Sequence, residues 1–396
     1  MPLPVFALML VVFSLTTGEF VISGIQPDVA AGLGVSIPAA GLLVTAYALG
    51  MIVGGPVVTV LTARLARKPL IAALVTVSVV GNLGSALAPN YAVLLPARFL
   101  AGSVVATFFA VAIATAVGMA PAGRQASTVA KVAVGMNLGI VLGTPIGTFI
   151  GQHAGWRATF AAVAAVSVAA LLLVLRFVPA RPRAAAGPVL GELRVFAGRD
   201  VQLALALTAV GNVGVVTVFT YIAPLLTDVG GFSAASVPLL LVVYGAGAVA
   251  GNLLGGRLAD RALMPSLAGL LGALTVALAL FWLLGGARPL AAVLTFVLGV
   301  LAFAIVPGMQ TRVLTTAEAA PTLAVAVNAS GFQLAAALAG WLGGTIIDDG
   351  PGLRSISLVG AVLTSAGLAV AVYILRRDRA RTAPAPGVRT RRSAGR

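Results

Sequence analysis

About twelve apolar stretches, each long enough to cross a lipid bilayer as a helix, constrain this 396-residue chain more than any other feature. They run at 5–27, 38–62, 69–88, 92–118, 127–151, 158–178, 201–226, 236–258, 265–286, 289–310, 323–347 and 353–375. The chain is 60% hydrophobic and 9% charged, with a mean hydropathy of +1.10. A soluble core of this length does not need so much apolar sequence. The pattern therefore predicts an all-α membrane protein with twelve transmembrane helices.

The basic residues are distributed unevenly and indicate an orientation. With the N-terminus in the cytoplasm, 21 of the 25 lysine and arginine residues fall on the cytoplasmic side. The others are Arg98 inside a span, and Arg157, Arg288 and Arg354 on the outer side. Because positive residues gather on the cytoplasmic side, we expect a multi-pass protein of the cell membrane with both termini cytoplasmic. This topology accounts for the net charge of +15 without a nucleic-acid partner.

The two halves of the chain repeat at a constant shift of 197 residues. The matching pairs are Pro27 and Pro224, Ser36 and Ser233, Tyr47 and Tyr244, Gly50 and Gly247, Gly54 and Gly251, Leu61 and Leu258, Arg64 and Arg261, and Gly102 and Gly299. Such a repeat predicts two similar bundles of six helices. We expect an N-terminal bundle at 1–178, a cytoplasmic linker at 179–200, a C-terminal bundle at 201–375 and a disordered basic tail at 376–396.

Residue types that catalytic and metal sites need are scarce. The chain has no cysteine and one histidine, His153, so neither disulfides nor a cysteine- or histidine-based metal site is expected. Neither lysine follows a glycine, which excludes a phosphate-binding G-x-x-x-x-G-K-[ST] loop. These observations argue against an enzyme, an ATP-driven pump and a bound cofactor.

Glu19 is a carboxylate well inside the first predicted span. An ionisable side chain at such a depth costs about 3 kcal/mol to insert and as a rule marks a site of function. Thr16, Ser23 and Gln26 share its helical face, since these positions lie three or four residues apart. The alternative is a structural carboxylate bonded to neighbouring helices, a role that Gln or Ser fills at lower cost. We therefore expect this helix to bring a titratable group into a polar cavity.

The stretch TTGEFVISGIQPDVAAGLGVS, at Thr16–Ser36, resembles the first-helix signature of the twelve-span drug:proton antiporters of the major facilitator superfamily. That group includes the actinobacterial chloramphenicol exporters. The resemblance covers essentially the whole chain. Two six-helix halves related by a parallel repeat, as predicted above, are also the architecture of this superfamily. It implies that Glu19 takes part in proton coupling and that substrate binds near the midplane, between halves that rock against each other.

The fourth span contains PARFLAG, which resembles the helix-4 arginine motif of the superfamily and supplies Arg98 and Gly102. Counted at about 1.5 Å per residue from Pro27 and Tyr91, Glu19 and Arg98 each lie roughly 11 Å from the outer surface. A buried arginine needs a partner, so we expect Arg98 to couple to Glu19 directly or through water. The alternative is that Arg98 bonds only to backbone carbonyls and water.

The fifth span carries glycine at every fourth position. These residues are Gly135, Gly139, Gly143, Gly147 and Gly151. They form a flat face for close helix approach, and Pro145 is expected to bend the helix. The run resembles the antiporter motif of exporters, except that Thr144 stands where the family usually has glycine. An ordinary packing face would explain the glycines but not the proline, so the run favours export over uptake.

Two loops resemble the superfamily motif G-x-L-A-D-R-x-G-R-R. The C-terminal half keeps it at Gly256, Asp260 and Arg261. The N-terminal half keeps only the basic residues Arg64, Arg67 and Lys68, which a positive-inside bias explains equally well. The resemblance implies a cytoplasmic gate, in which Asp260 helps to hold that side closed.

Other polar and aromatic residues inside the spans are candidates for a mostly apolar substrate cavity with a few hydrogen-bonding groups. Together with Thr16, Ser23 and Gln26 they are Tyr47, Phe109, Asn137, Tyr221, Tyr244, Asn328 and Gln333. Some of them are expected to act only as contacts between helices.

The sequence thus predicts a secondary transporter that exports a small amphiphilic compound, most simply a drug such as chloramphenicol, in exchange for protons. The alternative is an exporter of sugars, nucleosides or other metabolites that uses the same antiport mechanism. We expect a monomer in the lipid bilayer that is driven by the proton-motive force. A receptor or scaffold agrees with the composition but gives Glu19 and Arg98 no role.

Overall fold

The computed structural model describes residues 1–62, 64–121, 124–180, 198–317 and 321–382, and every regular element in these ranges is a helix. The N-terminal half contains α1 (Leu3–Phe20), α2 (Ile22–Leu33), α3 (Ile37–Leu61), α4 (Arg67–Ala86), α5 (Tyr91–Ser103), α6 (Val105–Met119), α7 (Gln125–Leu138), η1 (Gly139–Gly143), α8 (Thr144–Ala154) and α9 (Trp156–Phe177). The C-terminal half contains α11 (Arg199–Thr220), α12 (Ile222–Pro224), η3 (Leu225–Val229), η4 (Ala234–Ser236), α13 (Val237–Leu284), α14 (Arg288–Thr316), α15 (Pro321–Asp348), η5 (Leu353–Ser355) and α16 (Ile356–Thr382).

Within the described residues, eleven helical segments are long and apolar enough to span a membrane. One of them, Ala234–Leu284, has 51 residues, and the backbone leaves helical geometry at Ala262, where φ is −159° and ψ is 86°. A straight helix of that length would measure about 77 Å, more than twice the apolar thickness of a bilayer. α13 is therefore two spans joined at Ala262, and the twelve predicted spans are confirmed.

The predicted repeat is present in the packing as well as in the sequence. A β-carbon built on Gly50 would meet the Phe99 carbonyl, and one built on Gly247 would meet the carbonyl of Phe296. These contacts are related by the same shift of 197 residues. Gly102 and Gly299 likewise lie against the backbone carbonyls of the repeated tyrosines, Tyr47 and Tyr244. In both halves, glycine allows the second span to lie directly on the fourth.

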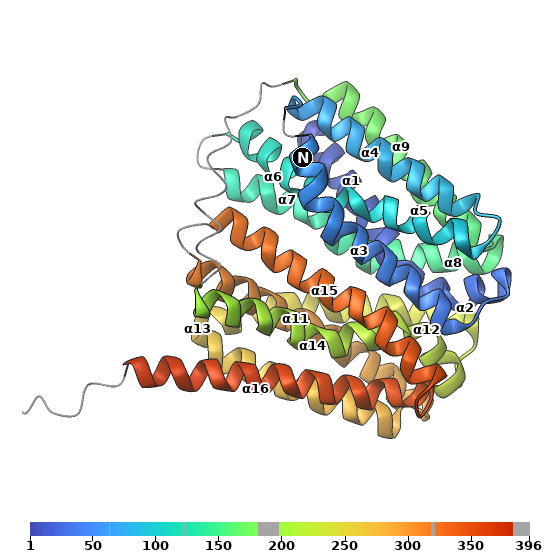
Figure 1. The fold of residues 1–396 in the computed structure, drawn as a ribbon, viewed down its shortest axis with the longest axis vertical. Coiled ribbons are helices and arrows are strands. Elements are labelled where there is room, and N and C mark those ends of the chain that lie inside the picture. The colour runs from blue at the N-terminus through green and yellow to red at the C-terminus, as the bar shows by residue number, and fades with distance from the viewer. Residues whose placement is uncertain (63, 122–123, 181–197, 318–320, 383–396) are drawn as a thin grey trace, which may run out of the picture.

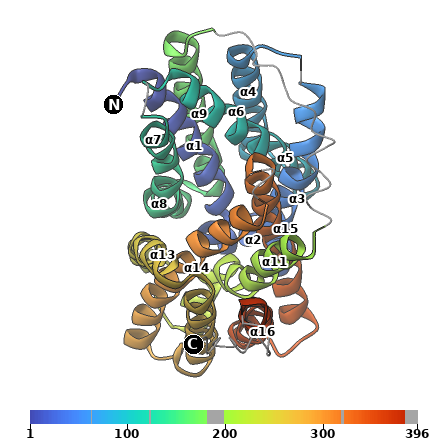
Figure 2. The same cartoon turned by 90° about the vertical axis from the view of Figure 1, so that its left-hand side faces the viewer.

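Each half has its own apolar core, and the two halves lie side by side (Figures 1 and 2). Figure 2 faces the end of the molecule where α1 begins and α16 ends, which we name the terminus end. The other end, where α2 leads into α3, is named the opposite end. The helices cross the molecule between these two ends.

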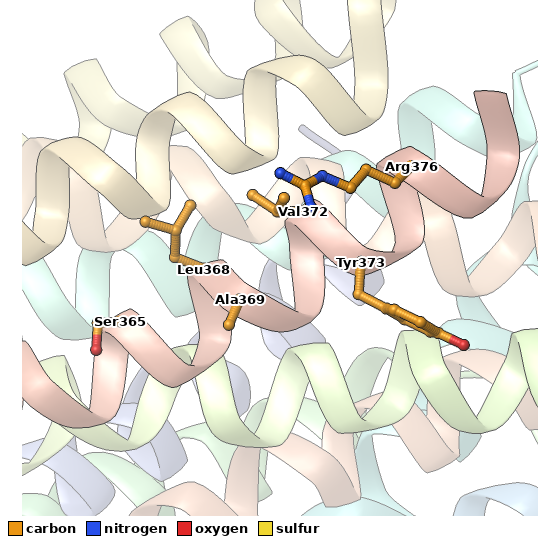
Figure 3. A pocket seen from close by; sticks show the side chains of 6 residues that line it. All are labelled: Ser365, Leu368, Ala369, Val372, Tyr373 and Arg376. Atoms are coloured by element: carbon orange, nitrogen blue, oxygen red, sulfur yellow. The ribbon is translucent and has the colours of Figure 1, made fainter. Parts of the chain in front are cut away.

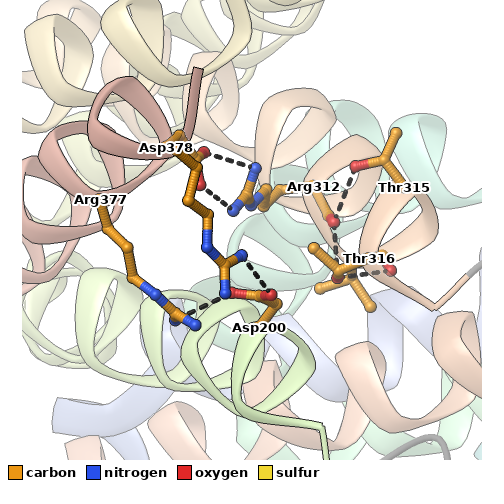
Figure 4. Close-up of polar contacts among 8 residues, drawn as sticks. Asp200, Arg312, Thr315, Thr316, Arg377 and Asp378 are labelled. Carbon is orange, nitrogen blue, oxygen red and sulfur yellow. Dashed lines mark hydrogen bonds and ion pairs between the residues drawn. The ribbon is translucent and has the colours of Figure 1, made fainter. Parts of the chain in front are cut away.

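At the terminus end of the C-terminal half, an ionic cluster ties α16 to α11 and α14 (Figure 4). Asp200 is 2.8 Å from both Arg377 and Arg381, and Arg312 is 2.9 Å from Asp378. The pairs lie in the last turns of α16, which continues to Thr382. The prediction of a disordered tail is therefore wrong for residues 376–382, while residues 383–396 lie outside the described part of the chain, as does most of the predicted linker.

Candidate functional site

The first span differs from its prediction in length and continuity. α1 ends at Phe20, the chain turns at Val21, and α2 continues through Pro27 to Leu33. Glu19 therefore lies about 21 Å from the end of this helical stretch, close to its middle, rather than roughly 11 Å as counted from Pro27. Proline is accommodated inside α2, so it did not mark the end of the helix.

Glu19 bonds to the other half of the protein. The amide Nε2 of Gln333, on α15, donates to Glu19 Oε1 at 2.9 Å. Gln333 is buried, and its Oε1 has no hydrogen-bond partner within the described residues. The structure thus brings together two residues that were predicted separately, one as a proton-coupling residue and one as part of the cavity.

Arg98 is fully buried and lies beside Glu19 without pairing with it. Its Nη2 donates at 2.6 Å to the carbonyl of Gly18, the residue before Glu19. Its guanidinium lies over the ring of Tyr47 at 4.6 Å and that of Phe160 at 5.1 Å. In the described part of the chain Arg98 forms no ion pair with Glu19. A direct pair, one of the two expected forms of coupling, is therefore absent in this conformation, because a backbone carbonyl and two rings hold the guanidinium. Coupling through water stays a prediction.

This contact also coincides with the break in the first span. In an unbroken helix the Gly18 carbonyl would accept a hydrogen bond from the backbone N–H of Ile22. Here the helix is interrupted at Val21, and the carbonyl accepts from Arg98. Arg98 therefore takes the place of a helical donor at the residue directly before Glu19.

Aromatic rings adjoin Glu19 at the junction of the halves. Phe20 packs edge-on against Phe219 of the C-terminal half, with ring centroids 5.9 Å apart. Phe219 in turn contacts Tyr244 at 4.7 Å, and Tyr244 contacts Phe303 at 6.4 Å. Tyr244 was predicted from the sequence, while the three phenylalanines were not. The junction combines these rings with few hydrogen-bonding groups.

The other predicted cavity residues do not form a single cluster with Glu19 and Gln333. Tyr47 donates to the Leu15 carbonyl, and Asn328 accepts from Thr208 within the C-terminal half. Tyr221 and Gln26 come together across the halves, since a β-carbon built on Gly41 would meet the Tyr221 hydroxyl and lie 3.1 Å from Gln26 Nε2. Tyr221 donates to the Gly340 carbonyl, and Gln26 donates to the Ile37 carbonyl.

Four more of these residues adopt different positions. Thr16 and Ser23 are buried on the first span, and Thr16 packs against Gly139. Asn137 is half-buried on α7. Phe109 packs edge-on against Phe108 in the N-terminal core.

The glycine face of the fifth span packs on the helices that carry Glu19. β-carbons built on Gly139 and Gly143 would meet Thr16 and Thr17, and one on Gly147 would lie 2.5 Å from a methyl of Val21. The π-helical turn η1 ends directly before Thr144 and Pro145. A π turn is the local adjustment that a missing proline donor favours. The glycines thus allow the fifth span to approach α1 and α2 closely.

The predicted gate lies at the terminus end. Asp260 and Arg261 are exposed just before the kink of α13, and neither makes a hydrogen bond or ion pair within the described residues. A β-carbon on Gly256 would have nothing within 4 Å, whereas one on Gly255 would meet the carbonyl of Ala304. Gly255, the residue before the motif, is therefore closely packed against α14, and the role of Gly256 in a gate stays a prediction.

The basic residues of the N-terminal loop do not reach the C-terminal gate residues. Arg67 donates to the Ala114 carbonyl of its own half at 3.1 Å, Arg64 is exposed and Lys68 is half-buried.

The contacts that join the halves lie between the middle of the bundle and the opposite end. Gln152 donates to the Ala234 carbonyl at 2.7 Å, and Thr45 donates to the Ala337 carbonyl at 2.7 Å. Near the terminus end, the polar contacts described above join helices of the same half. The opposite end is therefore the closed end of the junction.

A separate groove follows the exposed side of α16 (Figure 3). Its lining residues are Ser365, Leu368, Ala369, Val372, Tyr373 and Arg376. α16 packs against helices of its own half, so the groove belongs to the outer surface of the C-terminal half and not to the junction that contains Glu19.

Comparison with known proteins identifies the family. The model of the Major Facilitator Superfamily matches residues 8–323. The chain belongs to the major facilitator superfamily. This transporter is 36% identical over 372 residues to the inner membrane transport protein YdhP of Escherichia coli K12, which covers 94% of this chain and 95% of the relative.

Two further similarities involve proteins whose names mention a small molecule. A chloramphenicol resistance protein of Streptomyces lividans is 34% identical over 385 residues, 95% of each chain. The crystal structure of a D-xylose–proton symporter superposes with a TM-score of 0.74 over 93% of this chain and 96% of its own, at 17% identity. At that identity the structure supports the fold alone.

Two polar residues of the transporter were missed by the sequence analysis. Asn82 is buried on α4 next to Gly18, and Gln152 reaches across the halves at the opposite end. Both are single amides that belong to none of the predicted site residues. Their contacts with other helices, which the sequence does not reveal, are what make them candidates for a role in the site.

Proposed function

We propose that this transporter exports a small amphiphilic compound, such as chloramphenicol, in exchange for protons. The observation that carries the proposal is the hydrogen bond from Gln333 to Glu19. It places an ionisable side chain at the contact between two halves that must move against each other during transport. The protonation state of Glu19 therefore affects the contact that joins the halves.

Two protonation states of Glu19 require different bonds. A carboxylate only accepts, which suits the Nε2 donor of Gln333. A protonated Glu19 needs an acceptor for its own proton on one oxygen, so the present contact is weakened unless the amide turns. Proton binding thus weakens the contact between α1 and α15 at this point. A substrate group that donates to the Glu19 carboxylate in place of Gln333 requires the deprotonated form, so substrate binding favours proton release. This reciprocity is what exchange requires.

The rings near Glu19 support an amphiphilic, partly aromatic substrate. Phe20, Phe219 and Tyr244 offer apolar and aromatic faces, and Gln333 Oε1 is a buried acceptor without a partner in the described residues. Small-molecule sites commonly combine such an apolar lining with a few polar groups. The name of the Streptomyces relative supports chloramphenicol as the first compound to test.

The proposed orientation places the terminus end in the cytoplasm, with both chain termini there. The closed opposite end then faces outward, so the described conformation receives substrate from the cytoplasm. The proton-motive force supplies the energy, no cofactor is needed, and one chain suffices because both halves of the site come from it.

The test uses purified protein in proteoliposomes with radiolabelled chloramphenicol. Wild type should concentrate the label when the proton gradient drives exchange, and it should also exchange label for unlabelled compound without a gradient. Glu19→Gln should lose the first activity and keep the second, because its side chain cannot bind and release a proton.

Three outcomes decide between the alternatives. A Glu19→Gln protein that still accumulates label under a gradient would remove Glu19 from coupling. Exchange of sugars or nucleosides but not of chloramphenicol would show that the substrate is a metabolite and not a drug. Accumulation only when protons and substrate move in the same direction would overturn export.

A further inference from the structure

Asn82 and Arg98 come from different helices and meet the same residue of α1. Both are buried, Asn82 on α4 with 2% exposure and Arg98 on α5 with none. Arg98 donates to the Gly18 carbonyl at 2.6 Å, and a β-carbon built on Gly18 would lie 3.5 Å from Asn82 Oδ1. The two side chains thus converge on the backbone directly before Glu19.

The hydrogen bonds of Asn82 determine how its amide is turned. Its Nδ2 donates to the Ser78 carbonyl at 2.9 Å and lies 3.4 Å from the Ser78 hydroxyl. A backbone carbonyl can only accept, so the nitrogen must face Ser78 and Oδ1 must point away from it. Oδ1 has no hydrogen-bond partner in the described part of the chain, and the same holds for Nε and Nη1 of Arg98.

The C-terminal half lacks this arrangement. At the shift of 197 residues, Gly18, Asn82 and Arg98 correspond to Val215, Ala279 and Thr295. The helices are in register at this shift, since α5 begins at Tyr91 and α14 at Arg288. The buried amide and the guanidinium are therefore present together in the half that carries Glu19 and absent together at the matching positions of the other, which favours a shared role.

We propose that Asn82 is a positioning residue for proton coupling, which accepts a hydrogen bond from Arg98 through an internal water molecule and keeps the guanidinium on Gly18. Such a water accepts from Arg98 and donates to Asn82 Oδ1. It thereby pairs donors and an acceptor that are costly to bury unpaired. The inference rests on the proposed role of Glu19.

The consequence is a division of roles between two charged groups. Arg98 stays close to Glu19 without forming an ion pair, so the carboxylate is free to bind Gln333 or a proton. The titratable groups that interact with Arg98 are Glu19 on α1 and Tyr47 on α3. The charged residues of α4 and α9, the other helices packed here, lie near the ends of those helices: Arg67, Lys68, Arg157 and Arg176.

The test measures the thermal unfolding midpoint of purified protein against pH, which needs no substrate. The difference between the unfolding midpoints of wild type and Glu19→Gln at each pH isolates the contribution of the Glu19 proton. The pH range over which this difference changes is the Glu19-dependent transition. Asn82→Ala should release Arg98 toward Glu19 and move that transition to lower pH by roughly one unit, the order of effect of one new opposite charge. Asn82→Asp should hold Arg98 on α4, away from Glu19, and should therefore move the transition to higher pH.

Two variants separate this role from packing. Asn82→Gln keeps an acceptor and should restore the transition toward its wild-type pH. Ser85→Ala removes another buried polar group from α4, one bonded only to the Gly81 carbonyl, and should leave the transition in place.

Each result has a distinct meaning. A folded Asn82→Ala protein whose Glu19-dependent transition matches wild type would overturn the role of Asn82 while leaving Glu19 in coupling. Identical profiles for wild type and Glu19→Gln would instead overturn the proposed function, and this inference with it.

Discussion

Gln333 on α15 and Glu19 on α1 are joined by a hydrogen bond of 2.9 Å that crosses from one half of the transporter to the other. The two residues are more than three hundred positions apart in the sequence, and each half contributes one. Movement of the halves must break or replace this bond. It therefore connects the chemistry of one carboxylate to the conformation of the whole molecule.

Replacing Gln333 by Ala should weaken this connection. A hydrogen bond to a charged group contributes about 1.5–3 kcal/mol, so we expect proton-driven transport to fall by about tenfold or more. The measurement is chloramphenicol accumulation in proteoliposomes. Asn328→Ala is the matched control on the same helix, because Asn328 bonds to Thr208 of its own half. Equal losses in both variants would show that the contact with Glu19 has no special importance.

The glycine face of the fifth span should tolerate no large side chain. Gly147→Leu places several atoms where a β-carbon alone would already lie 2.5 Å from Val21, so the span is forced off α2 and transport should be lost. Gly269→Leu is the control, since nothing lies within 4 Å of its β-carbon position. Drug resistance of cells with equal protein levels reports the effect. Normal resistance with Gly147→Leu would exclude this face as a working interface.

Asp260 should matter for turnover rather than for binding. It is exposed and makes no hydrogen bond or ion pair with the described residues in this conformation. We therefore expect its partners to approach when the terminus end closes. Asp260→Asn should slow exchange severalfold, while the affinity measured by equilibrium binding stays within a factor of about two, since the site lies elsewhere. Unchanged exchange would mean that this motif has lost its function here.

Much of the fold follows from the sequence because the bilayer permits few solutions. Long apolar stretches must form helices, and glycines such as Gly50 and Gly102 repeat at the shift that relates the halves. Helix ends were less predictable. Pro27 was taken as the end of the first span, yet a proline inside a helix is tolerated when surrounding helices support it, and α2 continues to Leu33.

The site was predictable in its residues but not in its bonds. Glu19, Arg98 and Gln333 stand out as polar groups in apolar helices, and all three lie at or beside the junction. The pairing was not visible, because side-chain rotation decides it. Arg98 bonds to the backbone at Gly18, and Glu19 bonds to the opposite half. Asn82 gave no signal, since a single amide in a helix is as common in packing as in function.

Orientation can be tested directly because the chain contains no cysteine. Single cysteines at Asp260 and Ser233 mark the terminus end and the opposite end. A membrane-impermeant maleimide added to intact cells should label Ser233→Cys and should reach Asp260→Cys only after permeabilisation. The reverse pattern would place the termini outside and would make the described conformation open to the exterior.

Closure at the opposite end should be essential for only part of the cycle. Gln152 and Ala234 belong to different halves and are joined by a hydrogen bond of 2.7 Å. Cysteines at both positions, linked by a short reducible reagent, should hold that end closed, block transport almost completely and release it after reduction. Linked cysteines at Arg312 and Asp378, which pair within one half, are the control and should leave transport largely intact. Full transport by the linked Gln152–Ala234 variant would show that the opposite end does not open during exchange.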